Sequence, residues 1–206
     1  FLTPNQKGKF SSRELNDILP EHNKGMYTVP QILTNRSEEF IFCAQKLEEE
    51  FGYQEVNLNL GCPSKTVVSR YRGSGFLIKT DDLERFLDEI FEALDMRISV
   101  KTRIGKWDDE EFDELLRIYN RFPMEELIVH PRLQQDYYKN TPNLEAFEKA
   151  TEESANRLCY NGDIFTVEDL KRIEREFPQI TAMMIGRGVL RHPGLTGQLH
   201  GKDLPE

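Results

Sequence analysis

Short apolar segments alternate with amphipathic segments along most of the chain. The apolar segments are rich in Val, Ile, Leu or aromatic residues, and each ends in Gly, Pro or polar residues, which is typical of strands. They cover residues 27–34, 55–60, 98–102, 126–130, 158–160 and 182–185. Residues 1–3 have the pattern of the end of a further strand that enters a turn.

Segments with apolar residues at helical spacing lie between the expected strands. Ser37, Thr80 and Thr166 are placed to cap three helices, because a hydroxyl can accept a hydrogen bond from the first helical turn. Asp169, three residues after Thr166, would complete a capping box. Two further helices are expected near residues 112–122 and 143–155.

A strand followed by a helix, repeated along the chain, implies an α/β fold with parallel strands and helical crossovers. Six such units and the strand end at residues 1–3 fit a TIM (β/α)8 barrel that lacks its first strand, since a whole barrel needs about 250 residues. An open doubly wound sheet is the alternative. No Gly-x-Gly-x-x-Gly follows the first complete strand, which argues against the dinucleotide-binding form. The chain begins without Met and ends without a closing element, so we expect a fragment of a longer protein.

Composition narrows the class of protein. The 206 residues are 38% hydrophobic and 31% charged, which is typical of a soluble globular chain with one core. No apolar run approaches the roughly 18 residues of a membrane span, and no signal peptide is evident, so we expect a cytoplasmic, monomeric protein without a membrane partner. The net charge of −9, taken alone, argues against nucleic acid.

Three cysteines, Cys43, Cys62 and Cys159, lie far apart in the sequence, with no Cys-x-x-Cys pair and no Cys/His cluster. A disulfide framework or a metal site is therefore not expected. Cys62 lies between a glycine and a proline where a strand enters a turn. Its thiol suits a nucleophile, a proton donor or a packed core residue, and the redox and metal roles lack a second nearby cysteine.

Polar residues occur at the carboxyl ends of the expected strands, where βα barrels carry their chemistry. They are Gln31, Asn59, Cys62, Lys101, Arg103, His130, Arg132, Asn161, Gly162, Asp163, Gly186, Arg187 and Gly188. Any one of them alone fits an ordinary loop or core position, and a lone cysteine is more often buried. Their recurrence at successive strand ends favours a functional site.

The turns after the last two strands suit a phosphate group. Gly162, Gly186 and Gly188 allow backbone amides to approach an anion closely, and Arg187 offers a guanidinium fork. Barrels often bind phosphate with these loops. We therefore expect a phosphate-bearing cofactor whose ring would face Lys101 and Gln31. The pattern alone does not identify this cofactor as a flavin.

Several motifs together resemble the tRNA-dihydrouridine synthase family, from residue 29 to residue 195. They are Asn59-Leu60-Gly61-Cys62-Pro63, Val67, Gly73-Ser74-Gly75, Val100-Lys101-Thr102-Arg103-Ile104-Gly105, His130-Pro131-Arg132, Asn161-Gly162-Asp163-Ile164 and Met184-Ile185-Gly186-Arg187-Gly188. The family's Ala-Pro-Met strand is absent, and Leu133-Gln134-Gln135-Asp136 replaces its usual Thr-Arg-x-Gln run.

The resemblance implies that residues 1–206 form an FMN-binding TIM-barrel catalytic domain, without the C-terminal helical domain that grips tRNA. It implies reduction of a tRNA uridine to 5,6-dihydrouridine, with hydride from FMN N5 to C6 and a proton from Cys62 to C5. NADPH or NADH would then reduce the flavin again. FMN contacts are implied for Gln31, Lys101, His130, Asn161, Gly162, Asp163, Gly186 and Arg187.

The resemblance also implies an RNA substrate whose target base leaves its stack to reach the flavin. Asn59 and Arg132 are expected near the substrate, and Lys65, Arg70 and Arg72 are expected to hold the RNA backbone. Tyr71 could stack on a base. An ordinary solvated basic turn explains residues 65–72 equally well. The alternative functions are an FMN-dependent reductase of a small molecule, of the dihydroorotate or enoate type, and a non-catalytic binding module.

Overall fold

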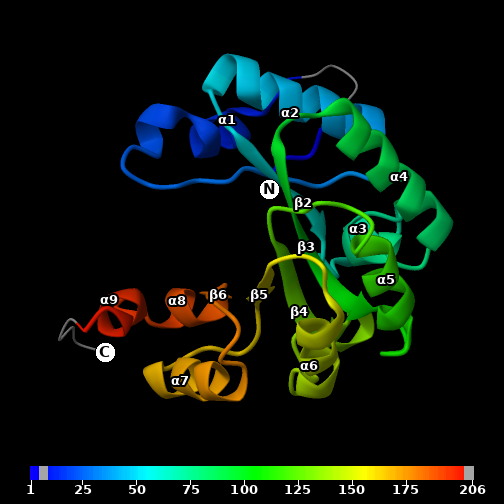
Figure 1. Cartoon of the computed structure of the whole chain (residues 1–206). Coiled ribbons are helices and arrows are strands. Elements are labelled where there is room, and N and C mark those ends of the chain that lie inside the picture. Colours follow the sequence, from blue (N-terminus) through cyan, green and yellow to red (C-terminus); the bar gives the residue numbers. More distant parts are fainter. Residues whose placement is uncertain (5–8, 202–206) are drawn as a thin grey trace.

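A six-stranded parallel sheet, ordered β1-β2-β3-β4-β5-β6, forms the centre of the computed structural model, which describes residues 1–4 and 9–201 (Figure 1). The strands are β1 (Gln31–Ile32), β2 (Glu55–Leu60), β3 (Arg97–Gly105), β4 (Leu127–Leu133), β5 (Leu158–Tyr160) and β6 (Ala182–Met183). Leu2 adds an isolated parallel bridge to Ile32. Each strand pairs with its neighbour in sequence, as in a TIM barrel, so the expected α/β fold is confirmed as a partial barrel.

Four helices cover the outer side of the sheet in an arc, and the other side is left open (Figure 1). They are α2 (Ser37–Phe51), α4 (Thr80–Ala93), α5 (Glu111–Tyr119) and α6 (Leu144–Glu153). Val56 and Leu58 of β2 belong to one buried cluster with Phe40 of α2 and Phe86 of α4, whose rings meet edge to face at 5.8 Å. Because side chains alternate along a strand, the residues between these apolar ones face the concave side.

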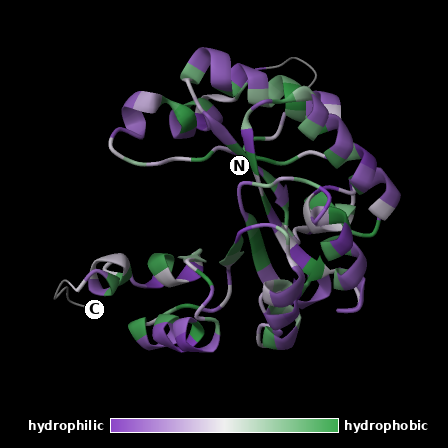
Figure 2. Ribbon diagram, in the orientation of Figure 1, coloured by the Kyte–Doolittle hydropathy of each residue, from purple (hydrophilic) through white to green (hydrophobic). Residues whose placement is uncertain are grey.

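Hydropathy follows the same division. The strands and the inner helix faces are hydrophobic, and the outer helix faces are hydrophilic (Figure 2). The acidic residues, which outnumber the basic ones by 36 to 27, therefore lie largely on solvated helix surfaces. None of the helices among the described residues combines the length and apolar character needed to span a bilayer.

Further helices complete the described part of the chain. They are α1 (Ser12–Ile18), α3 (Lys65–Val68), α7 (Val167–Glu176), α8 (Arg187–Arg191) and α9 (Leu195–Leu199), with 3₁₀ turns η1 (Pro20–His22), η2 (Gly73–Phe76) and η3 (Gln134–Asp136). The sequence analysis missed α1, although Ser11 and Glu14 form a capping box at its start. It also placed a loop where α3 forms.

Helix starts and strand limits differ in detail from expectation. Ser37 and Thr80 are the first helical residues and not caps, because the N-cap positions fall on Arg36 and Lys79. Thr166 does cap α7, and its capping box with Asp169 is confirmed.

Two strands are shorter than expected: only β1 forms within residues 27–34, and only β6 forms within residues 182–185. Residues 27–30 lie outside any strand, since Tyr27 is exposed and Pro30 has no N–H to donate to a neighbouring strand. The strands at 98–102 and 126–130 instead extend to Gly105 and Leu133.

We predict that Leu58→Ala destabilises the chain by about 3 kcal/mol, because Leu58 is fully buried between the sheet and its helices. Urea unfolding followed by circular dichroism would measure the change. The matched control is Leu190→Ala, which truncates an exposed leucine and should change the free energy of unfolding by less than about 0.5 kcal/mol. Equal losses in the two variants would contradict this account of the core.

Candidate functional site

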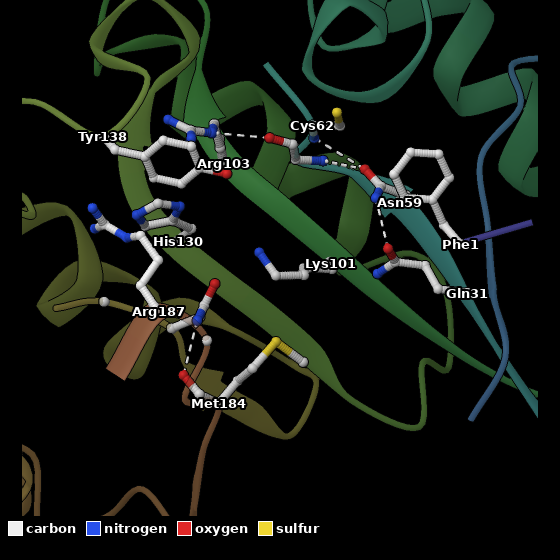
Figure 3. Close-up of a pocket in the computed structure, with 14 residues that line it drawn as sticks. Phe1, Gln31, Asn59, Cys62, Lys101, Arg103, His130, Tyr138, Met184 and Arg187 are labelled. Atoms are coloured by element: carbon white, nitrogen blue, oxygen red, sulfur yellow. Dashed lines mark hydrogen bonds between the residues drawn. The ribbon is translucent and has the colours of Figure 1, made fainter. Parts of the chain in front are cut away.

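A cavity of about 270 Å³ lies on the concave side, at the carboxyl ends of the strands. Nine residues that the sequence analysis selected line it together (Figure 3). They are Gln31, Asn59, Cys62, Lys101, His130, Asn161, Gly162, Gly186 and Arg187. Strand ends from Gln31 to Arg187 thus converge on one cavity, as the repeated strand–helix pattern predicts.

The side chain of Asn59 sets the shape of the cysteine turn. Its Oδ1 accepts hydrogen bonds from the backbone N–H groups of Gly61 at 3.1 Å and Cys62 at 3.0 Å. Its Nδ2 donates to Gln31 Oε1 at 2.7 Å (Figure 3). Gln31 Nε2 in turn donates to Asn57 Oδ1 at 2.7 Å. This chain of amides leaves one orientation for each side chain, so the position of the Cys62 backbone is tied to two strands.

A second turn holds the other side of the cysteine. Ser74 donates to the Cys62 carbonyl from its N–H at 3.1 Å and from Oγ at 2.9 Å. Gly73 has φ +54°, and a Cβ at this position would lie 2.7 Å from the Cys62 carbonyl oxygen. Glycine is therefore required for this close approach. The backbone of Cys62 is fixed on both sides, and its half-buried, free thiol lines the cavity.

Arg103 joins the cysteine turn to the segment after β4. Its guanidinium is 1% exposed and donates to the carbonyls of Gly61 at 2.9 Å, Leu133 at 2.7 Å and Tyr137 at 2.6 Å. Burial lowers the pKa of Arg103 to about 10, which leaves it charged at neutral pH. The sequence analysis noted Arg103 at a strand end but did not assign it to the site.

Tyr138 lies at the rim of the cavity and was missed by the sequence analysis. Its ring stacks on His130 at 6.3 Å and lies 5.5 Å from the Arg103 guanidinium and 4.6 Å from that of Arg187. It is 53% exposed. Tyr137, in a left-handed conformation with φ 53°, turns the chain before it, and nothing in the sequence pattern indicates that turn.

Arg132 and Asp163 lie behind the cavity wall and do not line the cavity. Arg132 is 1% exposed and binds Asp163 at 2.5 Å, His130 Nε2 at 3.0 Å and two backbone carbonyls. Asp163 also binds Arg187 at 2.5 Å. The expected substrate contact of Arg132 and cofactor contact of Asp163 stay predictions. Both residues orient His130 and Arg187.

Lys101 extends into the middle of the cavity from β3 (Figure 3). Burial, followed by the nearby charge of Arg103, lowers the pKa of its ammonium to about 8. Throughout residues 1–4 and 9–201, no hydrogen bond or ion pair is found for this ammonium. A buried cation without a partner is costly, so the position suits an electron-rich ligand.

The imidazole of His130 is kept neutral. Burial and the surrounding cations, Arg103 first among them, lower its pKa to about 2. Arg132 donates to Nε2, which places the single ring proton on Nδ1.

The basic residues after the cysteine turn lie outside the cavity. Lys65 and Arg70 are exposed. Arg72 is partly buried and pairs with Glu39 at 3.4 Å. Lys65 and Arg70 are therefore free to meet a partner at the surface, whereas Arg72 is held against α2.

We predict a pH-dependent contribution of His130 to stability. The unfolded chain binds a proton at this position below about pH 6.5 and the folded chain does not, so stability falls as the pH falls below 6.5, by up to about 1.4 kcal/mol per pH unit. His130→Gln keeps an acceptor for Arg132 and removes the titration. In urea unfolding, the difference between wild type and variant should stay constant above pH 7 and move in favour of the variant between pH 6.5 and 4.5. Parallel profiles down to pH 4.5 would refute the assignment.

Comparison with known proteins gives a consistent result. The family model described as dihydrouridine synthase (Dus) matches residues 10–204. A probable tRNA-dihydrouridine synthase of Rhizobium leguminosarum bv. phaseoli is 27% identical over 84% of this chain and 55% of its own. The tRNA-dihydrouridine synthase B of Vibrio vulnificus is 28% identical over 79% of this chain and 52% of its own.

A tRNA-dihydrouridine(16) synthase of Pseudomonas syringae pv. tomato is 31% identical over 73% of this chain and 48% of its own length. The chain therefore spans about half the length of the curated relatives it matches. The family match covers the cysteine turn, the strand ends and the whole cavity wall from Gln31 to Arg187. On this match, the chain belongs to the dihydrouridine synthase family.

Proposed function

We propose that residues 1–206 form the FMN-binding catalytic domain of an enzyme that reduces a uridine in tRNA to 5,6-dihydrouridine. The observation that carries the proposal is the cavity at the strand ends, which is lined by the free thiol of Cys62 and by the ammonium of Lys101, a group without a hydrogen bond or ion pair among the residues that the structure describes. The printed names of the relatives, all tRNA-dihydrouridine synthases, support this substrate over a small molecule of the dihydroorotate or enoate type.

The residues present fit FMN. Lys101 offers a cation, and Gln31 and Asn161 offer amides in the same cavity. No atom lies within 4 Å of the Cβ position at Gly186, so there is room for a ligand beside Arg187. We assign the flavin ring to Lys101 and Gln31 and the phosphate to Arg187 and the turns at Gly162 and Gly186. Bound FMN, reduced by NADPH or NADH, would supply the hydride for the uracil ring.

The protein's own contribution is to deliver a proton. Cys62 Sγ lies on a turn whose backbone is fixed by Asn59 and Ser74, and a positioned thiol can act as a general acid. His130 is a poor candidate, because its lone pair at Nε2 is used by Arg132 and its pKa stays far below neutrality. We therefore assign the acid role to Cys62, toward C5 of the uracil.

We predict that Cys62→Ala in the full-length protein keeps FMN and its reduction by NADPH but lowers dihydrouridine formation on unmodified tRNA by at least about 100-fold. Stopped-flow flavin absorbance and mass spectrometry of the tRNA would measure the two half-reactions separately. Cys43→Ala removes a buried thiol in α2 and should leave both at wild-type rates. Dihydrouridine formed by Cys62→Ala at the wild-type rate would show that the acid assignment is wrong.

We also predict that flavin affinity falls as the pH rises. The free protein loses the charge on Lys101 around pH 8, so the dissociation constant of FMN should rise above that pH, by up to about tenfold per pH unit. Fluorescence titrations between pH 7 and 9 would measure it. Riboflavin, which lacks the phosphate, should show the same trend. Lys101→Met should bind both weakly and without the pH dependence, and an unchanged profile in this variant would reject the role of Lys101.

A further inference from the structure

We propose that a groove beside the cysteine turn binds the RNA strand that flanks the target uridine. This inference rests on the proposed function and extends it to a second contact site. The groove, a cavity of about 350 Å³, lies between the amino-terminal ends of α2 and α4 and the turn that carries Tyr71. In a βα unit the helix starts at the carboxyl end of its strand. The groove therefore lies at the same end of the barrel as the cavity that holds Cys62.

The segment that runs beside this groove, and that lines it with Tyr71, Phe76 and Lys79, has a charge opposite to that of the whole chain. Residues 64–80 contain Lys65, Arg70, Arg72 and Lys79 and no Asp or Glu, within a chain whose net charge is −9. This basic segment begins directly after the cysteine turn. A strand of RNA that places a base in the cavity would meet these cations next, and phosphate contacts require them.

Tyr71 gives the groove a surface on which a base can stack. It is 48% exposed and lines the groove, and Lys79 Nζ lies 5.1 Å from its ring centroid. Its backbone has φ 51°, and the turn is held by a hydrogen bond of 3.2 Å from Asn35 Nδ2 to the Arg70 carbonyl. An aromatic ring beside a cation is the usual contact for single-stranded nucleic acid.

Two arginines on the facing helices complete the groove. Arg36 pairs with Glu39 at 3.7 Å and Arg85 pairs with Asp82 at 3.5 Å, and their side chains are 54% and 66% exposed. Ion pairs this exposed are weak, so both guanidinium groups can turn to a phosphate.

Acidic residues also line the groove, and they limit its net charge. Glu38, Asp82 and Glu89 line it together with Arg36, Lys79 and Arg85, and Glu89 accepts a hydrogen bond from Ser37 Oγ. RNA suits a groove of mixed charge with one exposed ring better than a strongly acidic protein does. Its bases can stack on the ring in addition to the contacts that its phosphates make with the cations.

The groove is connected to the reacting thiol by a short, rigid path. Ser74, two residues after Arg72, binds the Cys62 carbonyl through both its N–H and its hydroxyl. A nucleotide held at Tyr71 would therefore have a fixed position relative to Cys62. The groove would thus help to determine which base enters the cavity, in addition to adding affinity.

The test uses the full-length protein and an unmodified tRNA transcript in fluorescence anisotropy titrations over a range of salt concentrations. Lys79→Gln/Arg85→Gln should weaken tRNA binding by about tenfold or more and lower the slope of log K against log salt by about 1 to 2. Tyr71→Leu should weaken binding to a similar degree without changing the salt slope. Bound FMN per chain and the thermal unfolding midpoint report on folding and should match wild type in all variants.

The matched control is Arg117→Gln/Lys171→Gln. Arg117 is 65% exposed and has an i,i+3 carboxylate partner at 3.5 Å, like Arg85, but lies on α5 outside the groove. This variant should bind tRNA as wild type does.

Equal affinities for the groove variant and the control would overturn the groove assignment alone. Polyglutamate that binds wild type but not the groove variant, while both bind tRNA equally, would assign the groove to an acidic protein and would also overturn the proposal. A wild-type protein that neither binds nor modifies tRNA would instead reject the proposed function.

Discussion

The buried guanidinium of Arg103 is the interaction on which the rest of the site depends. A charge that is 1% exposed is tolerated only when its donors are used, and this one binds carbonyls from the cysteine turn, from the last residue of β4 and from Tyr137 after it. The pairing of β3 with β4 shifts between Arg103 and Gly105. The strand ends are thereby joined by the side chain of Arg103 as well as by the ladder. The same side chain places Gly61 on one side of the cavity and Tyr138 on the other.

The electrostatics of the cavity follow from this arrangement. Lys101, Arg103 and Arg187 line it, Arg132 lies directly behind, and Asp163 is the carboxylate that binds two of these four cations. The site is thus strongly positive inside a chain of net charge −9. Helix surfaces carry the acidic residues, and the strand ends carry the cations. Net charge is therefore a poor guide to the ligand of a barrel, because the mouth is a small part of the surface and fields focus there.

Features that depend on strand periodicity could be predicted from the sequence, and features that depend on loop conformation could not. Asn59, Lys101 and His130 were found because a repeated strand–helix unit brings all strand ends together. Tyr138 was missed, because its place over the cavity depends on the left-handed backbone of Tyr137. The burial of Arg132, which follows His130 by two residues on one face of β4, could not be predicted for the same reason. Its burial depends on carbonyls at residues 139 and 140, which no pattern in the sequence places there.

The proposal that a thiol acts as the acid follows from a comparison of the ionisable groups in the cavity. Its ionisable groups, among the residues that the structure describes, are Cys62, Lys101, Arg103, His130, Tyr138 and Arg187. Arginine does not release a proton, and His130 is neutral with its Nε2 occupied. Lys101 is better suited to act as a fixed positive charge than as an acid, because loss of its proton would remove a cation that can stabilise an electron-rich ring. Tyr138 lies at the exposed rim. Cys62 is the remaining group, and its backbone is held from both sides while its thiol lines the cavity, which is the physical basis of the acid role that we propose for it.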